Sequence, residues 1–194
     1  MVVLYHERQE SALCGLHALN NLCQGPYYAA GDLASIAHDL DSRERQLGLD
    51  KTHASENGDA SGNFSIQVLD EALRRAHAVS LEDTRKGTGA GAASAPPCGY
   101  ILHRSDHWYA LRKVGGVWYE LNSADDAPRT LVDVDAAIAQ LVADGWSVFA
   151  ARGELPPPMR RDSSIAPADN WFDTDRAGTR GGGGGSFSAA PLRA

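Results

Sequence analysis

The stretch HWYALRKVGGVWYELNS, residues 107–123, decides how this chain folds. Two runs rich in β-branched and aromatic residues flank Gly115-Gly116, a pair that is typical of a two-residue hairpin turn. If Val114 pairs with Val117, the numbers of paired residues sum to 231. The pattern therefore predicts an antiparallel hairpin with a fixed register.

This register brings a histidine close to an asparagine. Tyr109 lies opposite Asn122, and His107 is the diagonal neighbour of Asn122 on the same face. Diagonal partners lie roughly 7 Å apart at the backbone, so an imidazole can reach the amide oxygen. A four-residue loop keeps this register, whereas a three-residue loop would put the two side chains on opposite faces. The arrangement suits a general base and its orienter; the alternative is an edge histidine and an asparagine that ends a strand.

Outward from the hairpin, helical patterns dominate the first half of the chain and strand patterns the second, which is the order of an α+β domain. Apolar spacing predicts helices that begin at Ser11, as N-cap, and at Gly31-Asp32. The further expected elements are helices over residues 65–76 and 134–143, and strands over residues 78–81, 99–103, 107–114, 117–123 and 146–152.

Polar and glycine-rich segments divide these elements. We expect a mobile arm or loop over residues 47–63 and a flexible connector over residues 87–97. Residues 1–155 form the predicted domain, and residues 156–194 a disordered Pro/Gly-rich tail. Within that tail, Trp171-Phe172 is either a short docking motif or an accidental aromatic pair, and the second interpretation is favoured.

Composition narrows the class of protein. Residues 1–152 carry 13 Lys and Arg against 20 Asp and Glu, and residues 153–194 carry 5 against 5, so the net charge of −7 lies on the first part. Such a charge argues against binding to duplex nucleic acid. Three cysteines without a close-spaced pair favour a reducing compartment. With no signal peptide or membrane-spanning run evident, we expect a soluble cytoplasmic protein, with the nucleus as an alternative.

Cys14 is the candidate nucleophile. It lies in the first turn of its predicted helix, where free N–H groups and the helix dipole lower the pKa of a thiol. Cys23 fits the apolar helix face and Cys98 a strand start, so both are expected to be inert. Gln9, just before the helix, could supply an oxyanion donor with its side-chain amide, beside the backbone N–H of Cys14.

Other histidines compete with His107 for the role of base. His17 lies on the same helix face as Cys14, but it leaves little room for a substrate carbonyl, so we expect it to be a support. A zinc site can also be drawn from Cys14, His17, Cys98 and His103. Its spacings match no familiar ligand pattern, and we expect no metal and no cofactor. The order Cys, His, Asn is that of papain-type proteases.

Longer segments carry a resemblance that spacing alone does not reveal. The run YHERQESALCGLHALNNLCQG, residues 5–25, resembles the signature of the Josephin domain, a family of cysteine deubiquitinases. Further segments resemble that family in the same order: SIAHDLD, SGNFSIQVL, the His107-Trp108 pair, LNS and GWSVFAARGELP. The similarity covers nearly all of residues 1–155 and is closer to the branch of the Machado-Joseph disease protein than to the short Josephins.

The resemblance implies a papain-like fold, with helices packed on an antiparallel sheet. By position, Cys14 would be the nucleophile, His107 the general base and acid, Asn122 the orienter and Gln9 the oxyanion donor. The implied reaction is cleavage of the isopeptide bond after the C-terminal glycine of ubiquitin through a thioester, with ubiquitin or polyubiquitin conjugates as partners. The polar arm matches the place of a mobile helical hairpin in the family, but it is shorter here.

Ubiquitin contacts are implied at Tyr27, Tyr28, Ile66, Gln67 and Trp108, whereas Ala76 replaces an expected tryptophan. One alternative function is a module that binds ubiquitin or a ubiquitin-like protein with little turnover. Another is a papain-like protease or acyltransferase for a different substrate. Retention of all four chemical residues favours the deubiquitinase.

Overall fold

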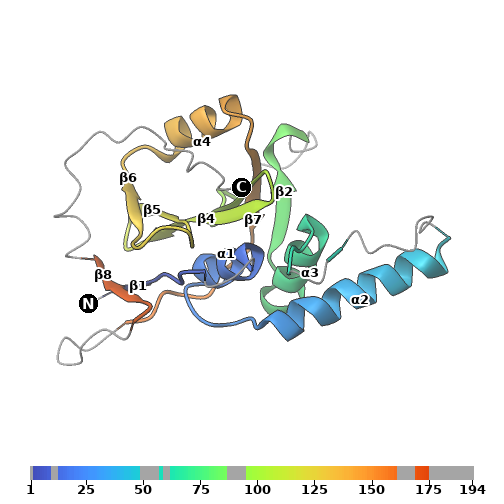
Figure 1. Cartoon of the computed structure of the whole chain (residues 1–194). Helices are drawn as coiled ribbons and strands as arrows, with labels where there is room; N and C mark the ends of the chain where they lie inside the picture. Colours follow the sequence, from blue (N-terminus) through green and yellow to red (C-terminus); the bar gives the residue numbers. More distant parts are fainter. Residues whose placement is uncertain are drawn as a thin grey trace, which may run out of the picture.

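A six-stranded antiparallel sheet forms the centre of the molecule (Figure 1). The computed structural model describes residues 2–9, 13–48, 57–58, 62–86, 95–160 and 169–174. The order of strands across the sheet is β2-β7-β3-β4-β5-β6. Their bounds are β2 Ser80–Asp83, β3 Gly99–Arg104, β4 His107–Val114, β5 Val117–Leu121, β6 Arg129–Leu131 and β7 Ser147–Arg152.

The β4–β5 hairpin has the predicted register. Val114 pairs with Val117 and Ala110 with Leu121, so the sum of 231 holds along the ladder. Gly115 and Gly116 have φ values of 59° and 89°, and two consecutive positive φ angles are what a type I′ turn requires. Glycine adopts this conformation without strain, which is why the pair fixes the turn.

Helices cover both faces of the sheet. Helix α1 (Cys14–Cys23) packs on one face and α4 (Val134–Ala143) on the other (Figure 1). Each face of the sheet carries a hydrophobic core, and side chains along β3 point to the two faces in turn. Ile101 lies in the core with α1, whereas Tyr100 and Leu102 lie in the core with α4. The resulting α+β architecture, with helices packed on an antiparallel sheet, is the predicted one.

Two further helices lie beside α1. Helix α3 (Ile66–His77) begins after Ser65, whose hydroxyl accepts the N–H of Val68 as an N-cap. Helix α2 (Ala30–Gln46) packs against α3 and continues past it (Figure 1). A short 3-10 helix, η1 (Thr84–Lys86), follows β2. The predicted helices over residues 65–76 and 134–143 are confirmed to within one residue.

The start of α1 differs from the prediction. The helix begins at Cys14, Leu13 occupies the N-cap position, and no side chain caps the N-terminus. The prediction that Ser11 is the N-cap is therefore wrong, and Ser11 itself lies outside the described residues. Sequence reasoning placed the cap at the polar residue nearest to the apolar run, whereas the helix begins later.

A second, two-stranded sheet joins distant parts of the chain. Strand β1 (Val3–Tyr5) pairs with β8 (Trp171–Asp173), and Trp171 lies edge-on to the ring of Tyr5 at 4.8 Å between centroids. The backbone N–H of His6 also donates to the carbonyl of Asn170 at 2.9 Å. The expectation of disorder throughout residues 156–194 is therefore wrong for β8, because Trp171-Phe172 packs on the chain's own first strand. Residues 161–168 and 175–194 lie outside the described residues.

Of the predicted arm over residues 47–63, the structure describes residues 47–48, 57–58 and 62–63. Asn57 is fully buried, and its Nδ2 donates to Asp41 Oδ1 at 2.8 Å and to Glu44 Oε2 at 3.2 Å. The arm is thus bound to α2 at Asn57, while residues 49–56 and 59–61 lie outside the described part. Residues 87–94 of the expected connector also lie outside the described residues. Among the described residues, no helix has the length and apolar character needed to cross a membrane.

Candidate active site

His107 and Asn122 meet at the open end of the hairpin. Nε2 of His107 lies 2.8 Å from Oδ1 of Asn122, which also accepts the backbone N–H of Ala124 at 3.1 Å. Because an amide oxygen only accepts, Nε2 must carry the proton, and the lone pair of the neutral imidazole is then on Nδ1. The contact predicted from the register is confirmed, and it fixes the orientation of the ring.

The thiol of Cys14 contacts the backbone of the two residues that flank His107 in the sequence. Sγ donates to the carbonyl of Asp106 at 3.5 Å, and the N–H of Trp108 lies at the sulfur. Ser105 and Asp106 form the β3–β4 turn with φ values of 49° and 61°. The first residue of α1 and the first residue of β4 are thereby brought together, as the nucleophile and base of a thiol hydrolase must be.

The pKa of the Cys14 thiol is raised above its ordinary value. Burial is the largest cause, since the residue is only 4% exposed, and the carboxylate of Asp106 adds to it. The N–H groups of Trp108, Gly15 and Cys14 act in the opposite direction but do not outweigh burial. The N–H groups at the helix terminus thus lower the pKa as predicted, but the net pKa is raised, because the sequence pattern did not show how deeply the thiol is buried.

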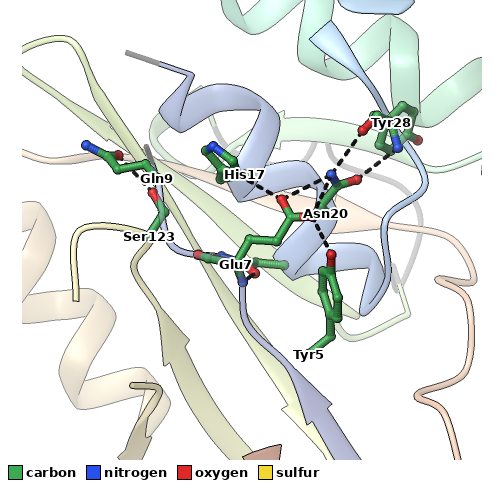
Figure 2. A network of polar contacts seen from close by, with 8 residues as sticks. Tyr5, Glu7, Gln9, His17, Asn20, Tyr28 and Ser123 are labelled. Atoms are coloured by element: carbon green, nitrogen blue, oxygen red, sulfur yellow. Dashed lines mark hydrogen bonds and ion pairs between the residues drawn. The ribbon is translucent and has the colours of Figure 1, made fainter. Parts of the chain in front are cut away.

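Gln9 lies beside the residue that follows Asn122. Its backbone N–H donates to the carbonyl of Ser123 at 2.9 Å, and the hydroxyl of Ser123 donates to its Oε1 at 2.9 Å. The amide nitrogen of Gln9 points away from Ser123 (Figure 2). Gln9 thus reaches the same end of the hairpin as Asn122, although residues 10–12 between it and Cys14 lie outside the described part.

The buried carboxylate of Glu7 binds helix α1 close to the candidate nucleophile. Glu7 Oε2 lies 2.8 Å from Nδ1 of His17, one turn along α1 from Cys14, and the hydroxyl of Tyr5 donates to Oε1 (Figure 2). Nδ2 of Asn20 lies 3.2 Å from both carboxylate oxygens. Burial alone would raise the pKa of Glu7, but the hydrogen bonds from His17, Tyr5 and Asn20 outweigh it and hold the pKa below the ordinary value. His17 is thus bound to Glu7, a contact that fits the supporting role predicted for it.

The same network reaches the loop between α1 and α2. Oδ1 of Asn20 accepts the N–H of Tyr28 at 2.9 Å, and Nδ2 donates to the carbonyl of Tyr28 at 3.1 Å (Figure 2). The hydroxyl of Tyr28 donates to the carbonyl of Ala72 on α3 at 3.2 Å. Asn20 therefore fixes the position of a residue that the family resemblance implies to contact ubiquitin.

The other implied ubiquitin contacts lie in different places. Tyr27 is 49% exposed and stands edge-on to His77, at the C-terminal end of α3. Ile66 and Gln67 are the first two residues of α3, so the length of this helix, roughly 1.5 Å per residue, separates them from Tyr27. The implied contacts thus form two separate pairs, Tyr27 with Tyr28 and Ile66 with Gln67, at opposite ends of α3.

Trp108 is placed in the core. It is 5% exposed, and its ring stacks on His103 with 4.0 Å between centroids. Because β4 alternates, Trp108 points to the side opposite His107 and packs with α1. The prediction that it contacts substrate therefore has little exposed surface to support it.

The alternative zinc set is not assembled. Cys98 donates its thiol to the carbonyl of Ala151 at 3.2 Å, while the other three side chains have the partners described above. Within the described part of the chain, no three His, Cys, Asp or Glu side chains gather in a way that could hold a metal ion.

Several residues of the site were missed by sequence reasoning. Glu7 and Asn20 bear no local signal, because their partners come from separate segments. Asp106 was missed although a polar residue pair in a turn before His107 was visible in the sequence. Ser123 was visible only as a neighbour of Asn122.

Over most of its length the chain is similar to known proteins. The family model described as Josephin matches residues 9–152. An ataxin-3 homologue of Oryza sativa is 38% identical over 90% of this chain, and the ataxin-3 homologue of Arabidopsis thaliana is 36% identical over 88%. Human ataxin-3 is 35% identical over 80% of the chain. The chain spans 58%, 66% and 47% of the length of these three relatives.

Proposed function

The chain belongs to the Josephin family, and from that premise we propose that it is a cysteine deubiquitinase that cleaves the isopeptide bond after the C-terminal glycine of ubiquitin. One observation carries the proposal: the 2.8 Å contact between His107 Nε2 and Asn122 Oδ1, with the thiol of Cys14 at the backbone that flanks His107. This is the constellation of nucleophile, base and orienter that acyl transfer requires.

The first half of the reaction forms a thioester. Nδ1 of His107 takes the proton of the Cys14 thiol as sulfur attacks the carbonyl carbon of the glycine, and a C–S bond forms. The oxyanion accepts hydrogen bonds from Nε2 of Gln9 and the N–H of Cys14. The imidazolium then returns its proton to the lysine nitrogen, the C–N bond breaks, and the amine leaves.

The second half releases ubiquitin. His107 takes a proton from water, the hydroxide attacks the thioester carbonyl, and the C–S bond breaks. The sulfur accepts the proton from the imidazolium, which restores the starting state.

The implied partners are ubiquitin or polyubiquitin conjugates, and the proposed location is the cytoplasm, with the nucleus as an alternative. Support for the substrate class comes from the family and from the tyrosines beside α3. Tyr27 offers an exposed ring, and the Asn20 network holds Tyr28 in place.

Reaction with a ubiquitin that carries a C-terminal electrophile tests the proposal. We expect one covalent adduct with the wild-type protein and with Cys98→Ala, and none with Cys14→Ala. Cys98 is the matched control because its thiol is half-buried and bonded to Ala151. An adduct that persists in Cys14→Ala would overturn the assignment. No adduct with a folded wild-type protein that still binds ubiquitin in an NMR titration would favour the binding module instead.

A further inference from the structure

Ser123 and Gln9 hold each other through two hydrogen bonds. The carbonyl of Ser123 accepts the backbone N–H of Gln9, and its hydroxyl donates to Oε1 of the Gln9 side chain, both at 2.9 Å. Ser123 is 2% exposed, so water does not compete freely for its hydroxyl. These contacts bridge 114 residues of sequence and fix both the main chain and the side chain of Gln9.

The side-chain bond decides which end of the carboxamide faces outward. A carboxamide has an acceptor end and a donor end, and only the donor end stabilises a developing oxyanion. With Oε1 bound to the hydroxyl of Ser123, Nε2 is directed away from it (Figure 2). A rotated amide would present its oxygen to the oxyanion and repel it.

We propose that Ser123 is a positioning residue for oxyanion stabilisation: its hydroxyl holds Gln9 Oε1, so that Gln9 Nε2 is directed to the oxyanion that forms when Cys14 attacks. The inference rests on the proposed function and deepens it, because it adds a residue to the same site. In this role Ser123 acts through Gln9.

Two adjacent residues at the end of β5 therefore have different proposed roles. Asn122 orients the base and the adjacent Ser123 orients the oxyanion donor. The two tasks are separable by experiment. Asn122 acts on the proposed base, whereas Ser123 acts on a neutral amide, so the loss of Ser123 should lower the rate without changing the pH profile of the reaction.

A double-mutant cycle on hydrolysis of ubiquitin with a C-terminal fluorogenic amide measures the effect. We expect Gln9→Ala to lower kcat by about 10²-fold and Ser123→Ala by about tenfold, with KM and the pH profile unchanged. In the Gln9→Ala background, Ser123→Ala should cost less than about twofold, because its target is gone. Ser42→Ala, a serine on α2 away from the site, is the control and should keep full activity.

A second readout does not depend on activity. In ¹⁵N–¹H spectra, the two side-chain amide protons of Gln9 should shift and sharpen in Ser123→Ala, while those of Asn122 stay in place. Ser123→Thr keeps a hydroxyl, so it should retain the wild-type Gln9 signals.

The outcomes separate the two proposals. The role of Ser123 would be overturned if Ser123→Ala lowered the rate as much in the Gln9→Ala background as in the wild type. Unchanged Gln9 signals in Ser123→Ala would overturn it as well. A wild-type protein that does not hydrolyse the ubiquitin substrate would overturn the proposed function, and the amide spectra would still decide whether Ser123 fixes Gln9.

Discussion

His107 Nε2 and Asn122 Oδ1 lie 2.8 Å apart, and the same oxygen is held by the backbone N–H of Ala124. The imidazole is therefore anchored to a side chain that is itself anchored to the main chain. This contact sets both the ring's orientation and its tautomer, and its removal has a definite kinetic consequence.

We expect Asn122→Ala to lower kcat on a ubiquitin substrate by about 10²-fold, since a positioned acid–base group contributes about 10²–10⁴-fold. Ubiquitin affinity should stay near that of the wild type. Asn122→Asp is the matched variant because it still accepts from both donors, so it should retain more activity than Asn122→Ala. Steady-state kinetics and a ubiquitin titration check this, and equal losses in both variants would argue against the orienting role.

The buried thiol predicts slow alkylation at neutral pH. Burial, followed by the Asp106 carboxylate, raises the pKa of Cys14, so the rate of its reaction with iodoacetamide should keep rising above the pH at which an ordinary thiol levels off. Asp106→Asn should move this titration to lower pH, because it removes a negative charge beside the sulfur. Mass spectrometry of the Cys14 peptide measures the rate. A titration below the ordinary thiol range in the free protein would show that an imidazolium already stabilises the thiolate.

Glu7 should be important for stability. Loss of the buried carboxylate removes the acceptor of His17 and of Tyr5 and one of the acceptors of Asn20, so we expect Glu7→Ala to lower the free energy of unfolding by about 3–5 kcal/mol. Exposed Glu154→Ala is the control and should change it by less than about 0.5 kcal/mol. Urea unfolding measures both.

Glu7 also predicts a pH dependence. Its pKa is held below the ordinary value of 4.5, so its contribution to stability is full above that pH and is lost as the pH falls through the lower value of the folded state. The stability difference between the wild type and Glu7→Gln should therefore shrink on acidification in that window. A difference independent of pH would mean that the carboxylate's charge is not what the network recognises.

The pairing of β8 with β1 should protect the first strand. We expect Trp171→Ala to lower the free energy of unfolding by about 1–2 kcal/mol and to speed amide exchange in Val3–Tyr5, because the ring packs on Tyr5. Thr174→Val, which removes only the hydroxyl that donates to the carbonyl of Val2, should cost about 1 kcal/mol or less. Unchanged exchange in Trp171→Ala would show that β8 does not stabilise β1.

Features set by neighbouring residues were predictable from sequence. The β4–β5 register followed from Gly115-Gly116 and from the period-two pattern on either side, and the contact of His107 with Asn122 followed from that register. Helix α4 has the expected bounds because Asp133 caps it with a hydrogen bond to the N–H of Ala136.

Features set by distant contacts were not predictable. Strands β1, β6 and β8 have three residues each, too few for a period to be recognised, and β8 finds its partner at the other end of the described chain. The pKa of Cys14 depends on burial under β4, which no local pattern reports. The two hydrogen bonds between Ser123 and Gln9 likewise join residues that are distant in the sequence.

The distance along the chain between Gln9 and Ser123 also orders events during synthesis. At about 5–20 residues per second, a ribosome needs roughly 6–23 seconds to proceed from one to the other. For most of that interval the nascent chain contains Cys14 while His107, Asn122 and Ser123 have not yet been synthesised. The proposed site can therefore assemble only late in translation, once the end of β5 has left the exit tunnel.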